Sequence, residues 1–424
     1  MNILFLGHIR TDDDANMLNT ILGVLARSGS EPTLALRKNR RINLTDNSLS
    51  AIKQLTFSEP NKLKLAHYDL MLTYNTTGSG QLKALAKRND IPTVCMMDAQ
   101  TFAKEYPMNQ RHVNKLVLIT PPRNFPAMLL QQDIVFPWRI AVTIPAFKKY
   151  RLNNSNKPRV LVIIHHQNLF FSPFYQIAPW LNKLLNFDIK VVSDNMALRK
   201  MLNPNIKVIA QKGIDIDHLI AETDIVVGSS NAALKAIALG KPVIVAGERG
   251  YGGLLNRENF LVQYHNHFQG RIGGELGEHI PEKLLMDNVL DLLEWGSERV
   301  NKMVKENHQL LKKESAKQEK ALLDFLQRTV NTHEQLKNDF WTMKLKLSGA
   351  WQLLLLTQDK YVLNNIQTGY VHSHFEKEEA EIIHLFGKGI EMKKALTASG
   401  YEEEPEMFAE FVQDLVHEKI LVAT

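Results

Sequence analysis

Short apolar runs alternate with helix-periodic segments through the first three hundred residues of the chain. Runs such as 225–227, in which every position is apolar, are typical of strands buried on both faces of a parallel sheet. The amphipathic segments between them favour βα units, and therefore an α/β fold. Strands are predicted at 2–6, 33–36, 70–73, 93–96, 116–120, 134–136, 159–164, 189–192, 206–210, 225–227 and 243–246.

A polar, turn-forming stretch at 148–158 interrupts this alternation, which resumes at residue 159. The interruption predicts two doubly wound, Rossmann-like domains in tandem, 1–150 and 151–300, with a cleft between them. Length points the same way, because 424 residues are too many for one hydrophobic core.

From residue 281 the pattern changes to helices rich in Lys, Glu and Gln. The charged positions of 281–345 indicate solvated helix faces, and 301–349 is predicted as a helical connector. Beyond it, a small, mainly α, winged-helix-like domain is predicted at 350–424. Its predicted elements are a strand at 360–363 and helices at 376–386, 391–397 and 407–418, with Ala380, Ile383, His384 and Phe386 facing inward.

The segment 222–256 carries the clearest candidate site. Its first strand ends in a turn at 228–231, whose Ser and Asn residues can cap the helix predicted at 232–239. A second strand then leads into a glycine-rich stretch at 247–253, which we expect to be a flexible loop. In open α/β sheets, ligands bind beyond the carboxyl ends of the strands, where helix N-termini attract phosphate.

Composition narrows the class of protein without selecting a ligand. Hydrophobic residues make up 44% and charged residues 23%, as in ordinary globular proteins, and the net charge of +6 indicates only a mild attraction to anions. Cys95 is the only cysteine, which excludes an intrachain disulfide and a thiolate metal cluster. No apolar run approaches the roughly 20 residues that span a bilayer, and the first residues read as a strand rather than a signal peptide. A cytoplasmic enzyme is therefore expected.

Several phrases of the second domain carry a resemblance. They are DIVVG at 224–228, ALKAIALGKPV at 233–243, GYGGL at 250–254, ENF at 258–260 and FQGRIGG at 268–274. Together they resemble the nucleotide-sugar half of a GT-B glycosyltransferase, particularly of the family-4-like branch. The resemblance implies a nucleotide diphosphate sugar as donor on the second domain and an acceptor on the first. It implies no further cofactor and no bound metal.

The resemblance and the strand ends together suggest the site residues. At the first domain, His8 and Asp12 are candidates for the catalytic base, with the start of a helix favoured by acidic side chains as the alternative. The other candidates have ordinary structural alternatives too: helix capping, a hairpin without a ligand, or a structural loop. The predicted donor-binding residues are His165, His166, Gly228, Ser229, Ser230, Asn231, Lys235, Glu248, Gly250, Tyr251 and Gly252.

Lys235 departs from the family pattern. Enzymes of this type usually carry at that position a glutamate that accepts hydrogen bonds from the ribose of the donor. Lysine has donors only, although it could contact phosphate as a point charge. Either the donor is held differently, or transfer is weakened or lost. Glu248 lies nearby in the sequence as another acceptor.

The C-terminal segments KYVLN at 360–364, AEIIHLFGKG at 380–389 and FVQDLVHEKIL at 411–421 resemble winged-helix domains that recognise leader peptides in peptide-modifying enzymes. Such a domain would recruit a peptide or protein acceptor by strand addition. Its acidic helices argue against nucleic acid as the partner. The alternative is a structural or oligomerisation appendage.

The sequence as a whole predicts a GT-B glycosyltransferase. A sugar-nucleotide epimerase or hydrolase on the same fold is the second hypothesis. A degenerate GT-B domain that serves as a binding scaffold is the third, with Lys235 as the mark of lost donor chemistry.

Overall fold

The computed structural model describes residues 1–7, 12–37, 52–57, 67–74, 91–98, 115–119, 135–138, 144–150, 157–163, 173–193, 196–210, 214–357, 359–367, 369–417 and 420–424. Contacts divide the chain into two compact units. One comprises Met1–Ile9, Leu22–Trp138 and Ala321–Thr424, and the other Arg10–Ile21 and Arg139–Lys320.

The N-terminal region forms a seven-stranded sheet in the order β3-β2-β1-β4-β5-β6-β7, with every pair parallel. Helix α1 (Asp12–Arg27) follows its first strand. Strand β1 is apolar and buried, as Ile3, Leu4, Phe5 and Leu6 are at most 2% exposed, which is typical of an inner strand of a parallel sheet. The strands of this sheet are β1 (Asn2–Gly7), β2 (Glu31–Arg37), β3 (Lys53–Phe57), β4 (Leu70–Tyr74), β5 (Thr93–Asp98), β6 (Lys115–Ile119) and β7 (Val135–Trp138).

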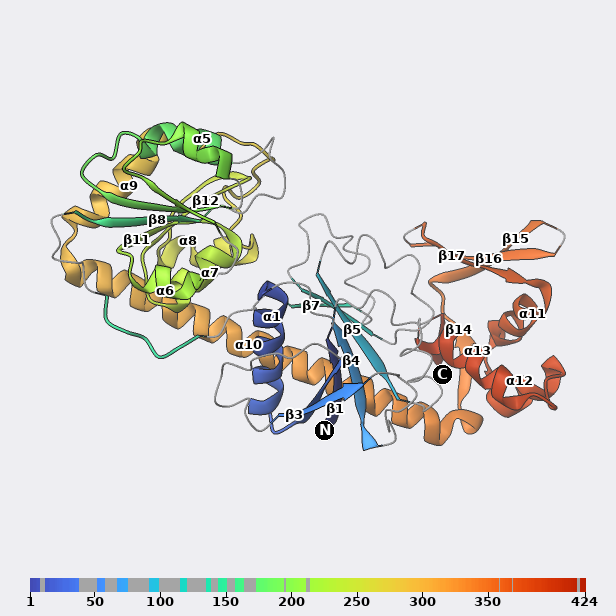
Figure 1. Ribbon diagram of the computed structural model, residues 1–424. Coiled ribbons are helices and arrows are strands. Elements are labelled where there is room, and N and C mark those ends of the chain that lie inside the picture. The colour runs from blue at the N-terminus through green and yellow to red at the C-terminus, as the bar shows by residue number, and fades with distance from the viewer. Residues whose placement is uncertain are drawn as a thin grey trace. The chain divides into compact units, whose positions relative to one another are not determined.

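The second region forms a six-stranded sheet in the order β10-β9-β8-β11-β12-β13 (Figure 1). All pairs are parallel except the last, in which β13 returns antiparallel to β12. Its strands are β8 (Arg159–Ile163), β9 (Asp188–Val192), β10 (Lys207–Ile209), β11 (Ile225–Gly228), β12 (Val243–Gly247) and β13 (Gly250–Leu254). Its helices are α5 (Phe174–Leu181), α6 (Ile216–Ala221), α7 (Ser230–Ala238), α8 (Arg257–His265) and α9 (Glu282–Glu294).

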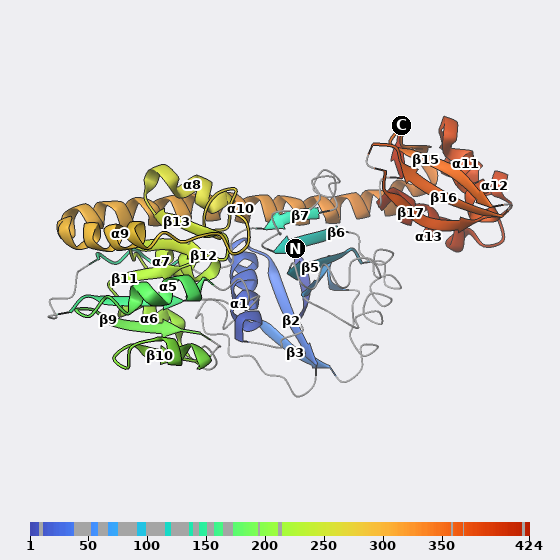
Figure 2. The same ribbon diagram turned by 90° about the horizontal axis from the view of Figure 1, so that it is seen from above.

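Alternate residues of this second sheet enter two separate cores. Val160 and Val227 face one core, which α5, α9 and the start of α10 (Gly296–Asp339) complete. Leu161 and Val226 face the other, which α6, α7 and α8 complete. Figure 2 shows these helices around the sheet from above. Burial on both faces explains why the strands read as unbroken apolar runs rather than alternating ones.

The amino edge of this sheet is fixed by a buried polar cluster. The Asp224 carboxylate is fully buried and accepts from the Arg159 backbone N–H at 2.8 Å and from its guanidinium at 3.4 Å. Lys241 Nζ donates to the carbonyls of Ala221 and Thr223, each at 2.7 Å. Burial raises the pKa of Tyr150 well above its usual value and lowers the pKa of Lys241. The cluster is structural, because it lies at the edge opposite the one where such sheets bind ligands.

The C-terminal part has its own core. Two three-stranded sheets and three helices enclose Phe375, Phe386 and Phe408. The strands are β14 (Lys344–Leu347), β15 (Trp351–Thr357), β16 (Lys360–Asn365), β17 (Val371–Glu376), β18 (Ile390–Glu391) and β19 (Leu421–Ala423). The helices are α11 (Lys377–Leu385), α12 (Met392–Ser399) and α13 (Pro405–His417).

Most predicted elements are present, and four expectations need correction. All twelve predicted strands occur, the one at 360–363 within β16. Helices occupy 282–294 and 296–342, as α9, the 44-residue α10 and a short 3₁₀ turn, but strand β14 begins at Lys344, so the helical stretch predicted to residue 345 ends earlier. The glycine-rich stretch expected to be a flexible loop contains a strand, β13, because it pairs with β12 as a hairpin. Strand β3 was not predicted, since KQLTF mixes polar and apolar residues. In α11, Ala380 and Ile383 are buried as expected, whereas His384 is exposed.

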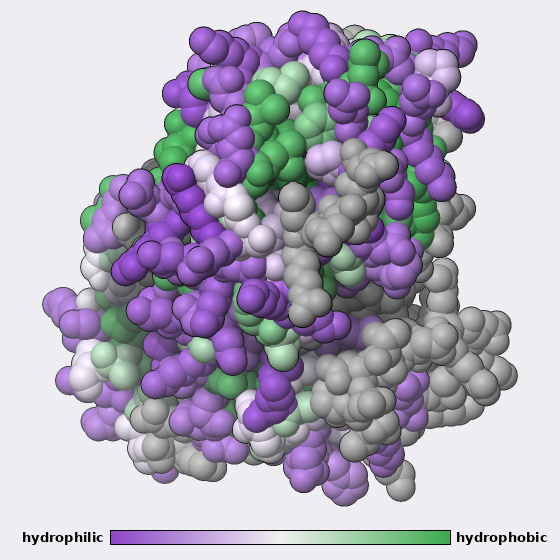
Figure 3. Space-filling model, turned by 90° about the vertical axis from the view of Figure 1, so that its left-hand side faces the viewer, coloured by the Kyte–Doolittle hydropathy of each residue, from purple (hydrophilic) through white to green (hydrophobic). Residues whose placement is uncertain are grey.

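The surface is mostly polar on the face shown in Figure 3, with hydrophobic residues gathered toward its upper part. Among the helices that the structure describes, none combines the length and hydrophobicity that crossing a bilayer requires.

Candidate functional site

The strand order of the second sheet contains a topological switch point. Strands β8 and β11 are neighbours, and the chain leaves them toward opposite sides, to β9 and to β12. Such a topological switch point opens a ligand crevice at the carboxyl ends of the two strands. Gly228 ends β11 at this point, and a β-carbon there would lie 3.0 Å from the Ile163 carbonyl oxygen, which ends β8. The turn 228–231 therefore lies at the switch point.

This turn starts α7 in an unusual way. Ser229 is the extended N-cap, yet among the described residues its side chain makes no capping hydrogen bond to the helix. Ser230 adopts a φ of 50°, and its N–H donates to the Phe268 carbonyl oxygen at 3.0 Å. Left-handed backbone at a non-glycine residue costs roughly 1–2 kcal/mol and concentrates at functional sites. The start of α7 carries the positive end of the helix dipole, which favours an anion.

Two glycines, Gly247 and Gly270, allow the segment 269–274 to approach this turn closely. A β-carbon on Gly247 would lie 2.5 Å from the Gln269 carbonyl oxygen and 2.7 Å from Ser229 Cβ. One on Gly270, whose φ is +128°, would lie 2.6 Å from the Gly250 carbonyl oxygen. Contacts that short do not occur, so glycine is required at both positions. The segment 269–274 consequently packs backbone to backbone against the β12–β13 hairpin.

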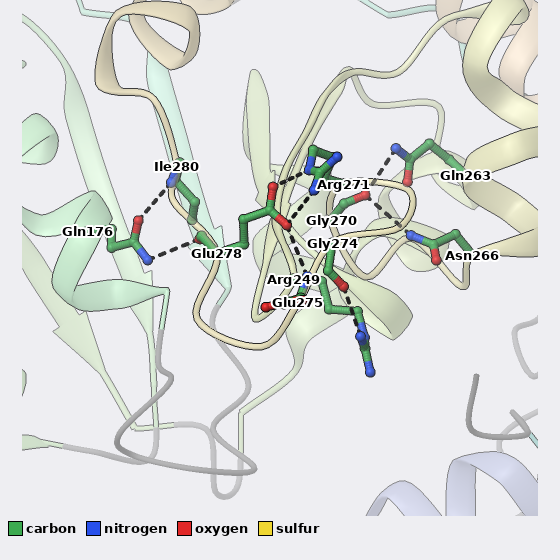
Figure 4. A network of polar contacts seen from close by, with 10 residues as sticks. All are labelled: Gln176, Arg249, Gln263, Asn266, Gly270, Arg271, Gly274, Glu275, Glu278 and Ile280. Carbon is green, nitrogen blue, oxygen red and sulfur yellow. Dashed lines mark hydrogen bonds and ion pairs between the residues drawn. The ribbon is translucent and has the colours of Figure 1, made fainter. Parts of the chain in front are cut away.

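A polar network holds the same segment in place (Figure 4). Arg249 Nη1 donates to the Gly274 carbonyl at 2.9 Å, and Gln263 Nε2 donates to the carbonyls of Gly252 and Gly270, each at 3.2 Å. Arg271 forms a bidentate ion pair with Glu278, with one contact at 2.9 Å. That hydrogen bond is the main reason why the pKa of Glu278 is lowered.

Because the Arg271–Glu278 ion pair closes the segment 271–277, we expect this segment to loosen in acid. Because the pKa of Glu278 is lowered in the folded state, the pair persists above the ordinary carboxyl pKa and is lost as pH falls through the lowered one. We expect amide-exchange protection factors over 271–277 to drop in acid, and to drop at pH 7 in Glu278→Gln. Glu314→Gln, which removes the carboxylate paired with the exposed Lys317 on α10, serves as the control. Unchanged protection in Glu278→Gln would contradict the prediction.

Several predicted site residues lie at the carboxyl edge of the second sheet, but the side chains of Tyr251 and Lys235 contact other helices. Glu248 is half-buried between β12 and β13, and its carbonyl accepts from the Gly277 N–H at 2.7 Å. The Tyr251 hydroxyl lies 2.6 Å from Asn288 Oδ1 on α9, and burial raises its pKa. Lys235 Nζ pairs with the Asp217 carboxylate at 2.9 Å. Asp217 was not predicted, because a contact between two helices leaves no local signal.

The roles predicted for the remaining catalytic and donor-binding residues stay predictions. His8, His165 and His166 lie outside the described residues, and Asp12 begins α1 with its side chain outside them too. Gly250 and Gly252 lie in β13, and Asn231 is exposed in the first turn of α7.

No protein-family model and no curated protein matches the sequence. Among solved structures, a glycosyltransferase from Rickettsia africae is similar with a TM-score of 0.51 and 13% identity, covering 78% of this chain and 98% of that one. A Listeria monocytogenes protein described as a UDP-N-acetylglucosamine 2-epimerase has a TM-score of 0.47 and 14% identity, and the match covers 72% of this chain and 90% of that one. S. aureus MnaA in complex with UDP has a TM-score of 0.42 and 14% identity, and the match covers 72% of this chain and 91% of that one. With the two doubly wound sheets, the first likeness confirms the predicted GT-B fold.

Proposed function

We propose that the chain is a GT-B glycosyltransferase of the family-4-like branch, which transfers a sugar from a nucleotide diphosphate sugar to an acceptor. The observation that carries the proposal is the start of α7 at the switch point of the second sheet. There a strained serine turn, glycine-lined backbone and a helix N-terminus meet where an α/β sheet takes its ligand.

The chemistry follows from that position. Transfer leaves a nucleoside diphosphate, so negative charge grows on the phosphate oxygens as the sugar–oxygen bond breaks. Backbone N–H groups and the helix dipole, fixed before the reaction, would stabilise that charge. His8 and Asp12 remain the proposed bases on the first domain, and His165 and His166 the proposed additional phosphate contacts.

Calorimetric titration with UDP, ADP, GDP, CDP and dTDP tests the donor site. At least one is expected to bind, and binding of none would end the proposal. Incubation with the matching nucleotide sugars then separates the activities. Release of nucleoside diphosphate only when an acceptor is present supports a transferase, whereas turnover of the donor alone supports an epimerase or hydrolase. Binding of a nucleotide sugar without turnover supports the hypothesis of a degenerate GT-B domain that serves as a binding scaffold.

We further propose that the C-terminal part is winged-helix-like and recruits a peptide acceptor. A pocket of about 560 Å³ lies between β15, β16, α11 and the end of α12, and its lining includes Leu353, Tyr361, Ile382, Glu378 and Glu381. An apolar floor with carboxylates suits an extended peptide. To test this, the protein is incubated with a labelled sugar donor and with peptide, lipid and small-molecule acceptors. We expect the labelled sugar to appear in the peptide fraction, and its appearance only in the other fractions would contradict the proposal.

A further inference from the structure

A pocket of about 850 Å³ lies between the start of α10 and the segment 144–150 of the second region. Its four cationic side chains are Lys149, Arg299, Lys302 and Lys305. Among the described residues that line the pocket, Glu298 alone carries a carboxylate. Positive charge therefore exceeds negative charge in a concave part of the surface, which is the arrangement that attracts an anion.

The four cations have no ion-pair partner among the residues that the structure describes, and all four are exposed. Arg299, Lys302 and Lys305 follow one another at a spacing of three residues, which places like charges about 5–6 Å apart along the helix. Like charges at such a spacing destabilise a helix slightly, so a bound anion would relieve the repulsion.

Two contacts hold the walls of the pocket in place. Asn301 Nδ2 donates to the Tyr150 carbonyl oxygen at 2.7 Å, which joins α10 to the segment that carries Lys149. The Arg299 guanidinium lies over the Trp295 ring, with its central carbon 3.8 Å from the ring centroid. A cation–π contact of this kind positions the guanidinium and leaves its N–H groups able to donate to a ligand. Binding of an anion therefore needs less additional ordering of these side chains.

The pocket lies toward the amino edge of the second sheet. A β-carbon on Gly240, which follows α7 and precedes β12, would lie 3.0 Å from Phe147 Cε2 in the pocket lining. The charge of Asp224, which precedes β11, acts on the Tyr150 hydroxyl. The turn at 228–231 follows β11 and lies at the opposite, carboxyl edge. The pocket is therefore separate from the proposed donor site.

We propose that this basic pocket binds a soluble anion with several phosphate groups. Lys and Arg side chains only donate hydrogen bonds, and phosphate oxygens are acceptors that the planar guanidinium of Arg299 can meet in pairs. A concave site suits a small ligand, whereas helices that lie on membranes expose large apolar side chains. Phe147 and Trp295, the aromatic residues of the lining, are only partly exposed. Such a site is independent of the proposed function.

Calorimetry with inorganic tripolyphosphate tests the pocket. The wild-type protein is expected to bind it, and the double variant Lys302→Gln with Lys305→Gln should bind at least about tenfold more weakly, since two charge-assisted contacts are lost. The matched control is Lys312→Gln with Lys313→Gln, which removes two exposed lysines of α10 outside the pocket. It should change the Kd less than about twofold, because solvent and salt screen distant charges. An equal loss in the two double variants would overturn the inference.

Glu298→Gln should produce a gain that misfolding cannot imitate. It removes the carboxylate of the lining, so tripolyphosphate should bind about two- to threefold more tightly. Sedimentation with vesicles of phosphatidylglycerol is the parallel measurement for a membrane. Weaker tripolyphosphate binding in Glu298→Gln, no binding to the wild-type protein, or binding to the vesicles alone would overturn the inference.

Nucleoside diphosphates distinguish the pocket from the donor site. Their affinity should be the same in the wild-type protein and in Lys302→Gln with Lys305→Gln, because the two sites lie at opposite edges of the sheet. Loss of both ligands in this double variant would indicate one shared site and would overturn the inference. Binding of tripolyphosphate without binding of any nucleoside diphosphate would end the proposed function and leave the pocket assignment standing.

Discussion

Replacing Asp224 by alanine is expected to lower the free energy of unfolding of the second domain by about 2–4 kcal/mol. The carboxylate is fully buried, and it pairs with both the backbone N–H and the guanidinium of Arg159. Removing one partner of a buried pair leaves the other charge uncompensated, at roughly 3–5 kcal/mol. The expected loss is smaller here, because the Arg159 side chain is 30% exposed and water can reach it.

Urea unfolding followed by tryptophan fluorescence measures this loss, since Trp180 is fully buried in the same domain. Asp188→Ala is the control, because Asp188 begins the neighbouring strand β9 and is exposed. Asp188→Ala should change the free energy of unfolding by less than about 0.5 kcal/mol. Equal effects of the two substitutions would show that the burial of Asp224 does not determine how much its carboxylate stabilises the domain.

Gly247→Ala is expected to weaken nucleoside diphosphate binding at least tenfold and to cost about 1–3 kcal/mol of stability. The new β-carbon would meet the Gln269 carbonyl oxygen and Ser229 Cβ, so either the segment 269–274 or the serine turn must move. Both border the start of α7, and a displacement there separates the helix N-terminus from the phosphates it would bind.

Gly349→Ala is the matched control, because a β-carbon at Gly349 would meet nothing within 4 Å. Calorimetry and thermal unfolding of both variants measure the two effects. Wild-type affinity in Gly247→Ala would mean that the serine turn does not contact the ligand.

The sequence predicts most strands of the two sheets because these strands are buried on both faces. Runs such as Ile225 to Val227 are too short for a helix, and helical segments separate them from the next runs, which favours parallel strands. Strand β13 was misread because glycine has low strand propensity, whereas here glycine is required for the close approach of Gly270 and Gly252 to their neighbours. His384 shares a helix face with Ala380 by spacing alone, and spacing does not reveal how wide the buried face is.

The candidate site shows the same division. The turn at 228–231 follows from an apolar run, small polar residues and a helical segment in succession, which are local signals. Ser230 in the left-handed region and the Lys235–Asp217 pair depend on Phe268 and on a second helix, so only the three-dimensional arrangement reveals them.

The pairing of β8 with β11 also has a consequence for the order in which the second domain assembles. Ile225 pairs with Val160, 65 positions earlier, whereas the β12–β13 hairpin pairs Gly247 with Gly250. Closing a long loop costs more entropy and slows contact formation, so this central pairing should form late. The switch point then exists only in the completed domain. A ligand bound there recognises the native state alone, and it should raise the melting temperature in proportion to the logarithm of its concentration above Kd.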